Sequence, residues 1–157
     1  MLKDGSPAPD ARFETAEGPA SIKDYAGRKL VLYFYPKDDT SGCTREAQDF
    51  TALANDFAAA GAAIVGISKD SLASHKKFQA KYDLKVALGS DAEGGVCVAF
   101  GTWVEKAMYG RKYMGIERTS FLIDAAGKIA KIWPKVKVDG HTDDVLAAIK
   151  ELKKKAA

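Results

Sequence analysis

Short apolar runs alternate along the first half of the chain with longer segments of helical periodicity. Residues 29–35 (KLVLYFY) and 62–68 (AAIVGIS) are apolar almost throughout, which is typical of strands buried on both faces. Between them, apolar residues recur at helical spacing and predict a helix over residues 43–60, which Gly61 ends. A second helix is predicted at Leu72–Tyr82. This half of the chain therefore predicts parallel strands joined by a helical crossover.

The second half predicts a different arrangement. Two apolar runs, Thr119–Ile123 and Ile129–Trp133, flank the turn sequence Asp-Ala-Ala-Gly and indicate an antiparallel hairpin. The other predicted elements are N-terminal loops with a short hairpin, an extended piece at 87–89, a short helix at 94–100, and a closing helix at 143–154 capped by Thr142. Together these elements predict an α/β fold with a mixed central sheet, helices on both faces and a single domain over residues 1–157.

Composition and charge narrow the class of protein. Of the 157 residues, 46% are hydrophobic and 29% are charged, as in soluble globular proteins. No apolar run has the length of a membrane helix, and the charged start lacks a signal-peptide core, so we expect a cytoplasmic protein. The net charge of +3 is mixed in sign along the chain, which favours neither a nucleic-acid partner nor a membrane partner.

The two cysteines, Cys43 and Cys97, are too few for a disulfide-stapled scaffold and have no zinc-like spacing to the histidines. Cys43 follows a polar loop and begins the first predicted helix. The free N–H groups and positive dipole of a helix start favour the thiolate, which is the nucleophilic form. No C-x-x-C pair is present, which argues against a thioredoxin-type oxidoreductase. Cys43 is therefore the candidate reactive centre.

Two segments resemble a known family. Residues 33–50 (YFYPKDDTSGCTREAQDF) resemble the active-site segment of peroxiredoxins, and are most similar to the subfamily called peroxiredoxin Q or bacterioferritin comigratory protein. Residues 108–124 (MYGRKYMGIERTSFLID) resemble that subfamily's later strand, which carries an arginine. The resemblance implies a thioredoxin-like fold with an N-terminal extension. It also implies a monomeric, thiol-dependent peroxidase that needs no cofactor and reduces hydrogen peroxide and small organic hydroperoxides.

The resemblance also implies roles for individual residues. Cys43 matches the peroxidatic cysteine, which becomes a sulfenic acid, and Thr40 matches the hydroxyl that bonds the peroxide and the thiolate. Pro36 matches the proline that shields the site, and Arg118 matches the arginine that stabilises the thiolate and the peroxide oxygens. Glu46 matches an acidic residue that orients this arginine. Thr40 also fits as a helix cap, and Glu46 as a first-turn residue that complements the helix dipole.

The sequence leaves open how the sulfenic acid on Cys43 is reduced back to the thiol. Many members of the subfamily carry a resolving cysteine five residues after the peroxidatic one, but that position is Gln48 here. Cys97 matches a later position that other members use, and it fits equally well as an inert core thiol. In the second case thioredoxin or another thiol donor must reduce the sulfenic acid directly. A non-catalytic redox sensor or binding module that responds to oxidation of Cys43 is the alternative function.

Overall fold

The computed structural model describes residues 2–156, with the side chains of residues 2–152, and a seven-stranded mixed sheet forms its centre. The strands are β1 (Arg12–Thr15), β2 (Gly18–Ser21), β3 (Lys29–Phe34), β4 (Ala62–Ser68), β5 (Ala87–Ser90), β6 (Trp103–Met108), β7 (Arg111–Ile116), β8 (Thr119–Ile123) and β9 (Ile129–Trp133). The helices are the 3-10 helix η1 (Ile22–Tyr25), α1 (Ser41–Ala52), α2 (Ala54–Ala59), α3 (Leu72–Tyr82), α4 (Gly95–Ala99) and α5 (His141–Ala156).

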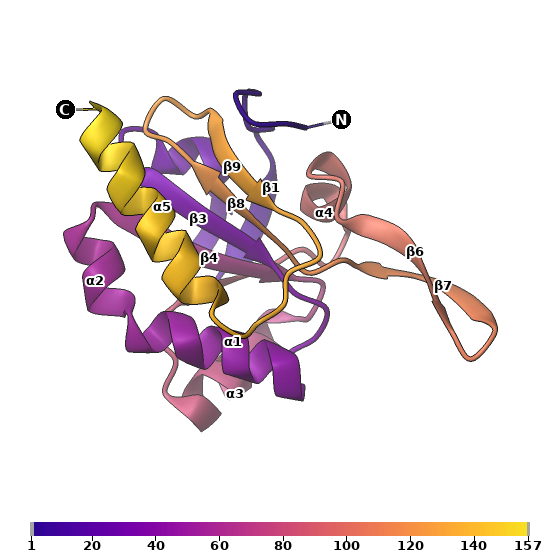
Figure 1. Cartoon of the computed structure of the whole chain (residues 1–157). Coiled ribbons are helices and arrows are strands. Elements are labelled where there is room, and N and C mark those ends of the chain that lie inside the picture. Colours follow the sequence, from indigo (N-terminus) through magenta and orange to yellow (C-terminus); the bar gives the residue numbers. More distant parts are fainter. Residues whose placement is uncertain (1, 157) are drawn as a thin grey trace.

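The order of strands across the sheet is β2-β1-β5-β4-β3-β8-β9 (Figure 1). The pairs β3–β4 and β4–β5 are parallel, whereas β8, β9 and the N-terminal hairpin of β1 and β2 pair antiparallel. This arrangement confirms the predicted mixed sheet, its parallel centre and the late hairpin.

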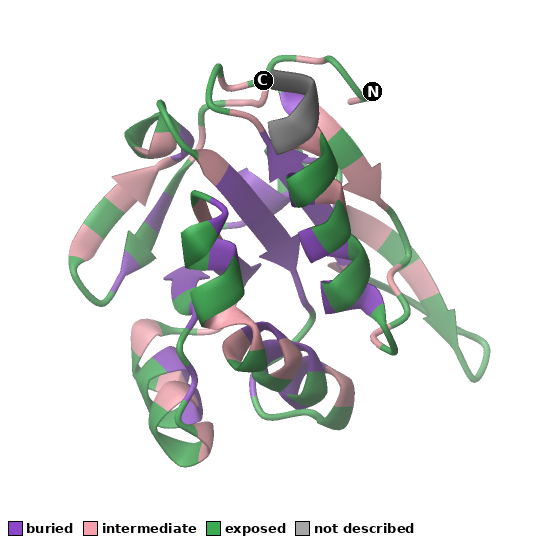
Figure 2. Cartoon of the chain, turned by 60° about the vertical axis from the view of Figure 1, so that its left-hand side comes forward, coloured by how far each residue is buried: buried purple, intermediate pink, exposed green. Residues whose placement is uncertain are grey.

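Strand β3 contributes to both cores of the molecule. Its odd-numbered residues, such as Tyr33, pack with α1, α3 and α5, while even-numbered residues such as Leu32 pack with η1 and α4 on the opposite face. Alternate side chains of a strand point to opposite faces, so a strand covered on both sides must be apolar throughout. Figure 2 shows this strand buried between the helices. The expected helices on both faces are therefore confirmed.

The first predicted helix differs from the prediction in its ends and continuity. It begins at Ser41 rather than at residue 43, and it breaks at Leu53, where the backbone leaves helical dihedrals (φ −104°, ψ 10°). After the break Phe57 still packs beside Phe50, with ring centroids 5.7 Å apart. Because one core accepts both rings, the apolar spacing across the break looks like that of a single helix.

The closing helix also begins earlier than predicted. Helix α5 begins at His141, after Gly140 in the left-handed region (φ +74°). The backbone N–H of Asp144 donates to the carbonyl of Gly140 at 3.2 Å. Thr142 therefore lies inside the first turn, and its prediction as the cap is wrong.

The hairpin of β6 and β7 was not predicted. It projects from the body of the molecule (Figure 1) and turns at Tyr109-Gly110, both with positive φ (+52° and +77°). The hairpin carries four of the exposed large hydrophobic side chains: Met108, Tyr109, Tyr113 and Met114. Only the base of the hairpin packs on the core, through Ile116 and Trp103. The projecting part needs no apolar stripe, so its sequence has no clear strand pattern.

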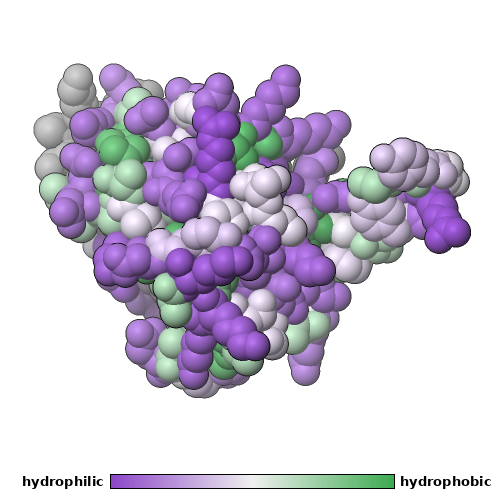
Figure 3. Space-filling view, turned by 90° about the horizontal axis from the view of Figure 1, so that it is seen from below, coloured by the Kyte–Doolittle hydropathy of each residue, from purple (hydrophilic) through white to green (hydrophobic). Residues whose placement is uncertain are grey.

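The surface is otherwise largely polar. Seen from below, the face formed by α1 and α3 is mostly hydrophilic, and the hairpin of β6 and β7 extends beyond it (Figure 3). Among residues 2–156, no helix combines the length and the apolar character that crossing a bilayer requires.

Candidate functional site

The site lies at the carboxyl edge of the central parallel strands. Strand β3 ends at Phe34, a polar loop follows, and α1 begins at Ser41, so that Cys43 falls in the first helical turn. This is the edge at which ligand sites of α/β folds collect. The Cys43 side chain is buried, with 2% of its surface exposed, and packs against the core beneath α1.

Strand pairing brings Arg118 to the same edge. Strand β8 runs antiparallel to β3, with Thr119 opposite Phe34. The start of β8 therefore lies beside the end of β3, and Arg118, the residue before Thr119, faces the loop that leads to Cys43. Arg118 occupies a two-residue link between β7 and β8 rather than the strand on which the resemblance placed it.

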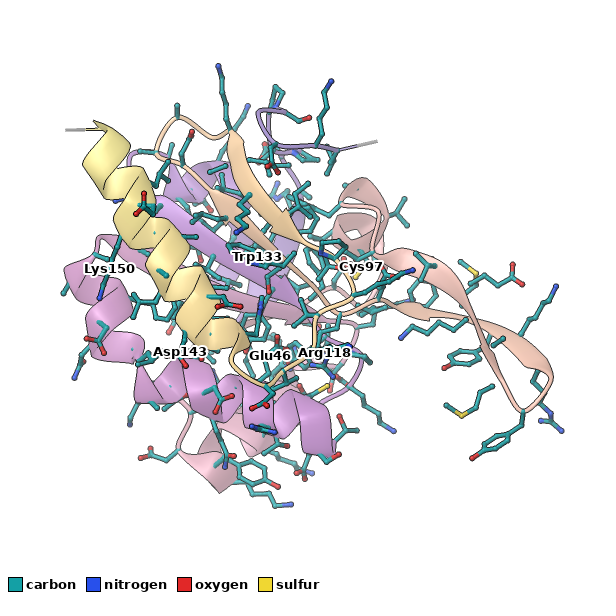
Figure 4. The ribbon with its side chains drawn as sticks, in the orientation of Figure 1. Glu46, Cys97, Arg118, Trp133, Asp143 and Lys150 are labelled. Atoms are coloured by element: carbon teal, nitrogen blue, oxygen red, sulfur yellow. The ribbon has the colours of Figure 1, made fainter. Side chains whose placement is uncertain are left out.

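The guanidinium of Arg118 contacts two groups at once. Its Nη2 donates to Sγ of Cys43 at 3.3 Å, and its Nη1 donates to Oε1 of Glu46 at 2.8 Å. Figure 4 shows Glu46 and Arg118 side by side below the sheet. A Cβ atom at Gly42 would lie 3.2 Å from Nη2, so a larger residue there would crowd the guanidinium. The structure thus joins three residues that the sequence separates by up to 75 positions.

Burial sets the electrostatics of this cluster. It raises the pKa of Glu46 to about 7, although the charge of Arg118 pulls in the opposite direction. Burial alone would lower the pKa of Arg118, but the neighbouring Glu46 and Cys43 hold it above its usual value. Oε2 of Glu46 is buried without a hydrogen-bond partner. Arg118 is therefore a fixed cation between two groups that are neutral or negative.

Thr40 and Pro36 lie on the exposed loop beside this cluster. Thr40 occupies the N-cap position of α1, but its side chain makes no capping bond. Instead its Oγ1 donates to the carbonyl of Lys37 at 2.8 Å, while its own carbonyl accepts from the backbone N–H of Thr44 at 2.8 Å. The hydroxyl oxygen keeps lone pairs and is held on the loop that leads into the first turn of α1.

Cys97 lies on the opposite face of the sheet from Cys43. It belongs to the core formed with η1 and α4, and its side chain has no exposed surface. Its backbone N–H donates to Oδ2 of Asp91 at 2.8 Å. Burial, followed by the nearby Asp91 carboxylate, raises the pKa of the Cys97 thiol to about 12. The structure therefore does not bring the two cysteines together.

A second polar cluster, which sequence reasoning missed, lies behind the loop. In the part of the chain that the structure describes, the residues Asp38, Asp70 and His75 are those spaced closely enough to hold a metal ion. Their side chains are instead hydrogen-bonded to protein groups. The sequence does not indicate this cluster, because His75 has no polar partner near it in the predicted helix at Leu72–Tyr82.

Comparison with known proteins gives consistent matches. Residues 5–132 match the model of the AhpC/TSA family. The chain is 48% identical over 146 residues to a putative peroxiredoxin bcp of Coxiella burnetii, covering 92% of this chain and 97% of that protein. A structure of the bacterioferritin comigratory protein of Xanthomonas campestris, studied for its alkyl peroxide reduction activity, has a TM-score of 0.85 and 45% identity over 90% of each chain. A mutant PrxQ of Xylella fastidiosa has a TM-score of 0.90 and 35% identity, covering 100% of this chain and 99% of that one.

Proposed function

Since the chain belongs to the AhpC/TSA family and is a thioredoxin-like peroxiredoxin, an enzyme that reduces hydroperoxides, we propose that Cys43 is the residue that attacks the peroxide. The contact between Nη2 of Arg118 and Sγ of Cys43 carries this assignment. A guanidinium at hydrogen-bond distance stabilises a thiolate, and it remains in place to receive the charge that moves onto the peroxide.

The reaction is a displacement on oxygen. The Cys43 thiolate attacks the terminal oxygen of the hydroperoxide, so that an S–O bond forms while the O–O bond breaks. The sulfur is oxidised to a sulfenic acid, and the leaving alkoxide or hydroxide takes a proton from solvent to become alcohol or water. Arg118 and the N–H groups of the first turn of α1 lower the barrier because they already point at the oxygens that gain charge.

Glu46 acts as a positioning residue in this scheme. Its carboxylate receives one arm of the guanidinium, which leaves the other arm directed at Cys43. Thr40 contributes its hydroxyl at the mouth of the site, and Pro36 shields the loop side. Their places on the loop between β3 and α1 support these two roles.

We further propose that an external thiol, from thioredoxin or another donor, reduces the sulfenic acid. A first thiol condenses with it to give a mixed disulfide and water, and a second thiol releases Cys43. The burial of Cys97 on the other face of the sheet supports this route over an internal disulfide, which needs Cα atoms within about 7 Å. The protein then works as a one-cysteine enzyme.

The substrate range follows from the relatives. The alkyl peroxide reduction activity of the Xanthomonas campestris relative supports small organic hydroperoxides as substrates, and hydrogen peroxide is the smallest hydroperoxide. No metal or organic cofactor takes part in the steps proposed above.

We also propose a monomer, as the resemblance implies. From composition, charge and the predicted elements we propose one domain over residues 1–157 in the cytoplasm, with neither nucleic acid nor membrane as a partner. Sedimentation of the purified protein tests the first point: a stable dimer would contradict it.

The decisive experiment is stopped-flow peroxide consumption by the wild type and by the variants Cys43→Ser and Cys97→Ser, with thioredoxin as the donor. We expect Cys43→Ser to lose turnover and Cys97→Ser to keep it. Turnover by Cys43→Ser would overturn the assignment of the nucleophile, and its loss in Cys97→Ser would restore an internal disulfide. A wild-type protein that is oxidised once without turning over would be the redox sensor instead.

A further inference from the structure

Behind the loop between β3 and α1 lies a buried pair of side chains, Asp38 and His75, called here the Asp38–His75 pair. Asp38 comes from the loop and His75 from the inner face of α3. Their exposed fractions are 7% and 2%, and Oδ2 of Asp38 lies 2.7 Å from Nδ1 of His75. Charged side chains are seldom buried this fully unless they are paired, so the pair needs a reason.

Hydrogen bonds saturate the carboxylate. Tyr35 donates its hydroxyl to Oδ1 of Asp38 at 2.5 Å, and Ser74 donates its hydroxyl to Oδ2 at 2.8 Å. Burial alone would raise the pKa of Asp38, but the bonds from His75, Tyr35 and Ser74 hold it below its usual value. Asp38 is therefore an ionised carboxylate inside the protein.

The ring of His75 faces acceptors on both sides. Nδ1 meets the ionised carboxylate of Asp38, and Nε2 lies 3.0 Å from the carbonyl oxygen of Gly89. Through these two contacts, His75 joins the loop to α3 and β5.

Further hydrogen bonds hold the loop against α3 and the residues just before it. The N–H of Asp38 donates to Oδ2 of Asp70 at 2.8 Å, just before α3. The neighbouring Asp39 accepts from Lys81 at 2.8 Å and from the hydroxyl of Tyr82 at 2.6 Å, but these bonds are exposed. The loop therefore has a buried anchor and an exposed anchor on the same helix, and each can be removed separately.

We propose that Asp38 and His75 are positioning residues of the peroxidase, which act by fixing the loop that carries Pro36 and Thr40 and leads into the turn of Cys43. This inference rests on the proposed function of Cys43. The physical reason is that a reacting geometry tolerates little error: a displacement of about 1 Å can cost up to about a hundredfold in rate. An exposed loop without this anchor would sample many positions of the Thr40 hydroxyl.

The test compares the variants Asp38→Asn and His75→Gln with the matched control Lys81→Gln, which loosens only the exposed anchor. The measurement is the second-order rate constant for oxidation of reduced Cys43 by hydrogen peroxide in a single turnover, with thermal unfolding recorded for each variant. We expect a fall of about tenfold or more in the first two variants while they remain folded. The control should stay within about twofold of the wild type, because exposed ion pairs contribute little.

Measurements in a second variant, Thr40→Val, distinguish a positioning role of the pair from a merely structural one. If the pair acts through the loop, adding His75→Gln to the Thr40→Val variant should not lower the rate constant for oxidation of Cys43 any further. If the two residues act independently, their effects on that rate constant should add. Lower thermal stability with an unchanged rate constant, or an additive effect in the Thr40→Val background, would overturn the proposal. The double variant Asp38→Ala/His75→Leu removes both partners together, and it is the protein to measure if a single variant fails to fold.

Failure of this inference is distinct from failure of the proposed function. If His75→Gln and Asp38→Asn react at the wild-type rate while Cys43→Ser is inactive, the peroxidase assignment stands and the positioning role falls. If Cys43→Ser remains active, the proposed function itself falls.

Discussion

Arg118 combines two tasks that a single charge could not perform in this geometry. A guanidinium is a planar fork, so its two Nη atoms donate in different directions from one rigid group. Here one points at Sγ of Cys43 and the other at Oε1 of Glu46. The carboxylate thereby holds the donor that the reaction needs.

This division of tasks predicts that Arg118→Lys is nearly as damaging as Arg118→Ala. A lysine keeps the positive charge but cannot span both acceptors in the same way. We expect the rate constant for peroxide reduction to fall roughly 10²–10³-fold in both variants, as when an oxyanion donor is removed. Single-turnover kinetics with folded variants measures it. A lysine variant close to the wild type would mean that charge alone is sufficient.

The roles of single residues were predictable only in part. The resemblance pointed to Cys43, Arg118 and Glu46, and the structure brings these three together. The pairing of His75 was not predictable, because its partner Asp38 lies 37 positions away and only the packing of α3 on the loop joins them. A local pattern carries no information on such a pair.

At the scale of the elements, the strands with two buried faces and the amphipathic helices were predictable, because burial imposes their pattern. The bounds of β4, α3, β8 and β9 agree with the prediction residue for residue. The hairpin of β6 and β7 was missed because only its base, at Trp103 and Ile116, packs on the core. The break at Leu53 was missed because Phe50 and Phe57 meet again in the same core.

Helix α4 shows how a short element is held by one side chain. Asp91 is buried, and its two carboxylate oxygens accept from the backbone N–H groups of Val96 and Cys97 at 3.1 and 2.8 Å. A helix of five residues is too short to be stable by itself. These two bonds therefore hold α4, and with it Cys97, against the sheet.

We accordingly predict that Asp91→Ala destabilises the protein by about 1–3 kcal/mol, since two buried N–H groups lose their acceptor. Asp91→Asn keeps one acceptor oxygen and should lose less. Urea unfolding measures both. The rate constant of Cys43 with peroxide should stay unchanged, because α4 lies across the sheet from the site. A parallel loss of that rate would connect the two faces and contradict the separation described above.

At the scale of the whole molecule, the site exists because of strand order. β8 inserts next to β3, so that the residue before β8 meets the loop after β3. The sequence predicted both strands but not their adjacency or register. Register is a property of the assembled sheet, and a shift of one residue would turn Thr119 and its neighbours to the other face.

Two buried groups near the site give opposite pH dependences to the stability of the fold. The pKa of Glu46 is raised from 4.5 to about 7, so its stabilising contribution is complete below pH 4.5 and is lost as the pH rises through 7. Burial lowers the pKa of His141 from 6.5 to about 4, so its contribution is complete above pH 6.5 and is lost as the pH falls through 4. In the wild type the two changes largely offset each other between these limits.

The pH dependence of each group should therefore become visible in single variants, although the two largely cancel in the wild type. The free energy of unfolding of the wild type minus that of Glu46→Gln should fall as the pH rises from 4.5 to 7, by on the order of 3 kcal/mol. The same difference for His141→Gln should fall as the pH drops from 6.5 to 4, by a similar amount. Urea unfolding across this range measures both, and the double variant should give a difference that is nearly flat. A wild-type advantage over Glu46→Gln that grows with pH would mean that Arg118 keeps the Glu46 carboxylate ionised throughout, against the effect of burial.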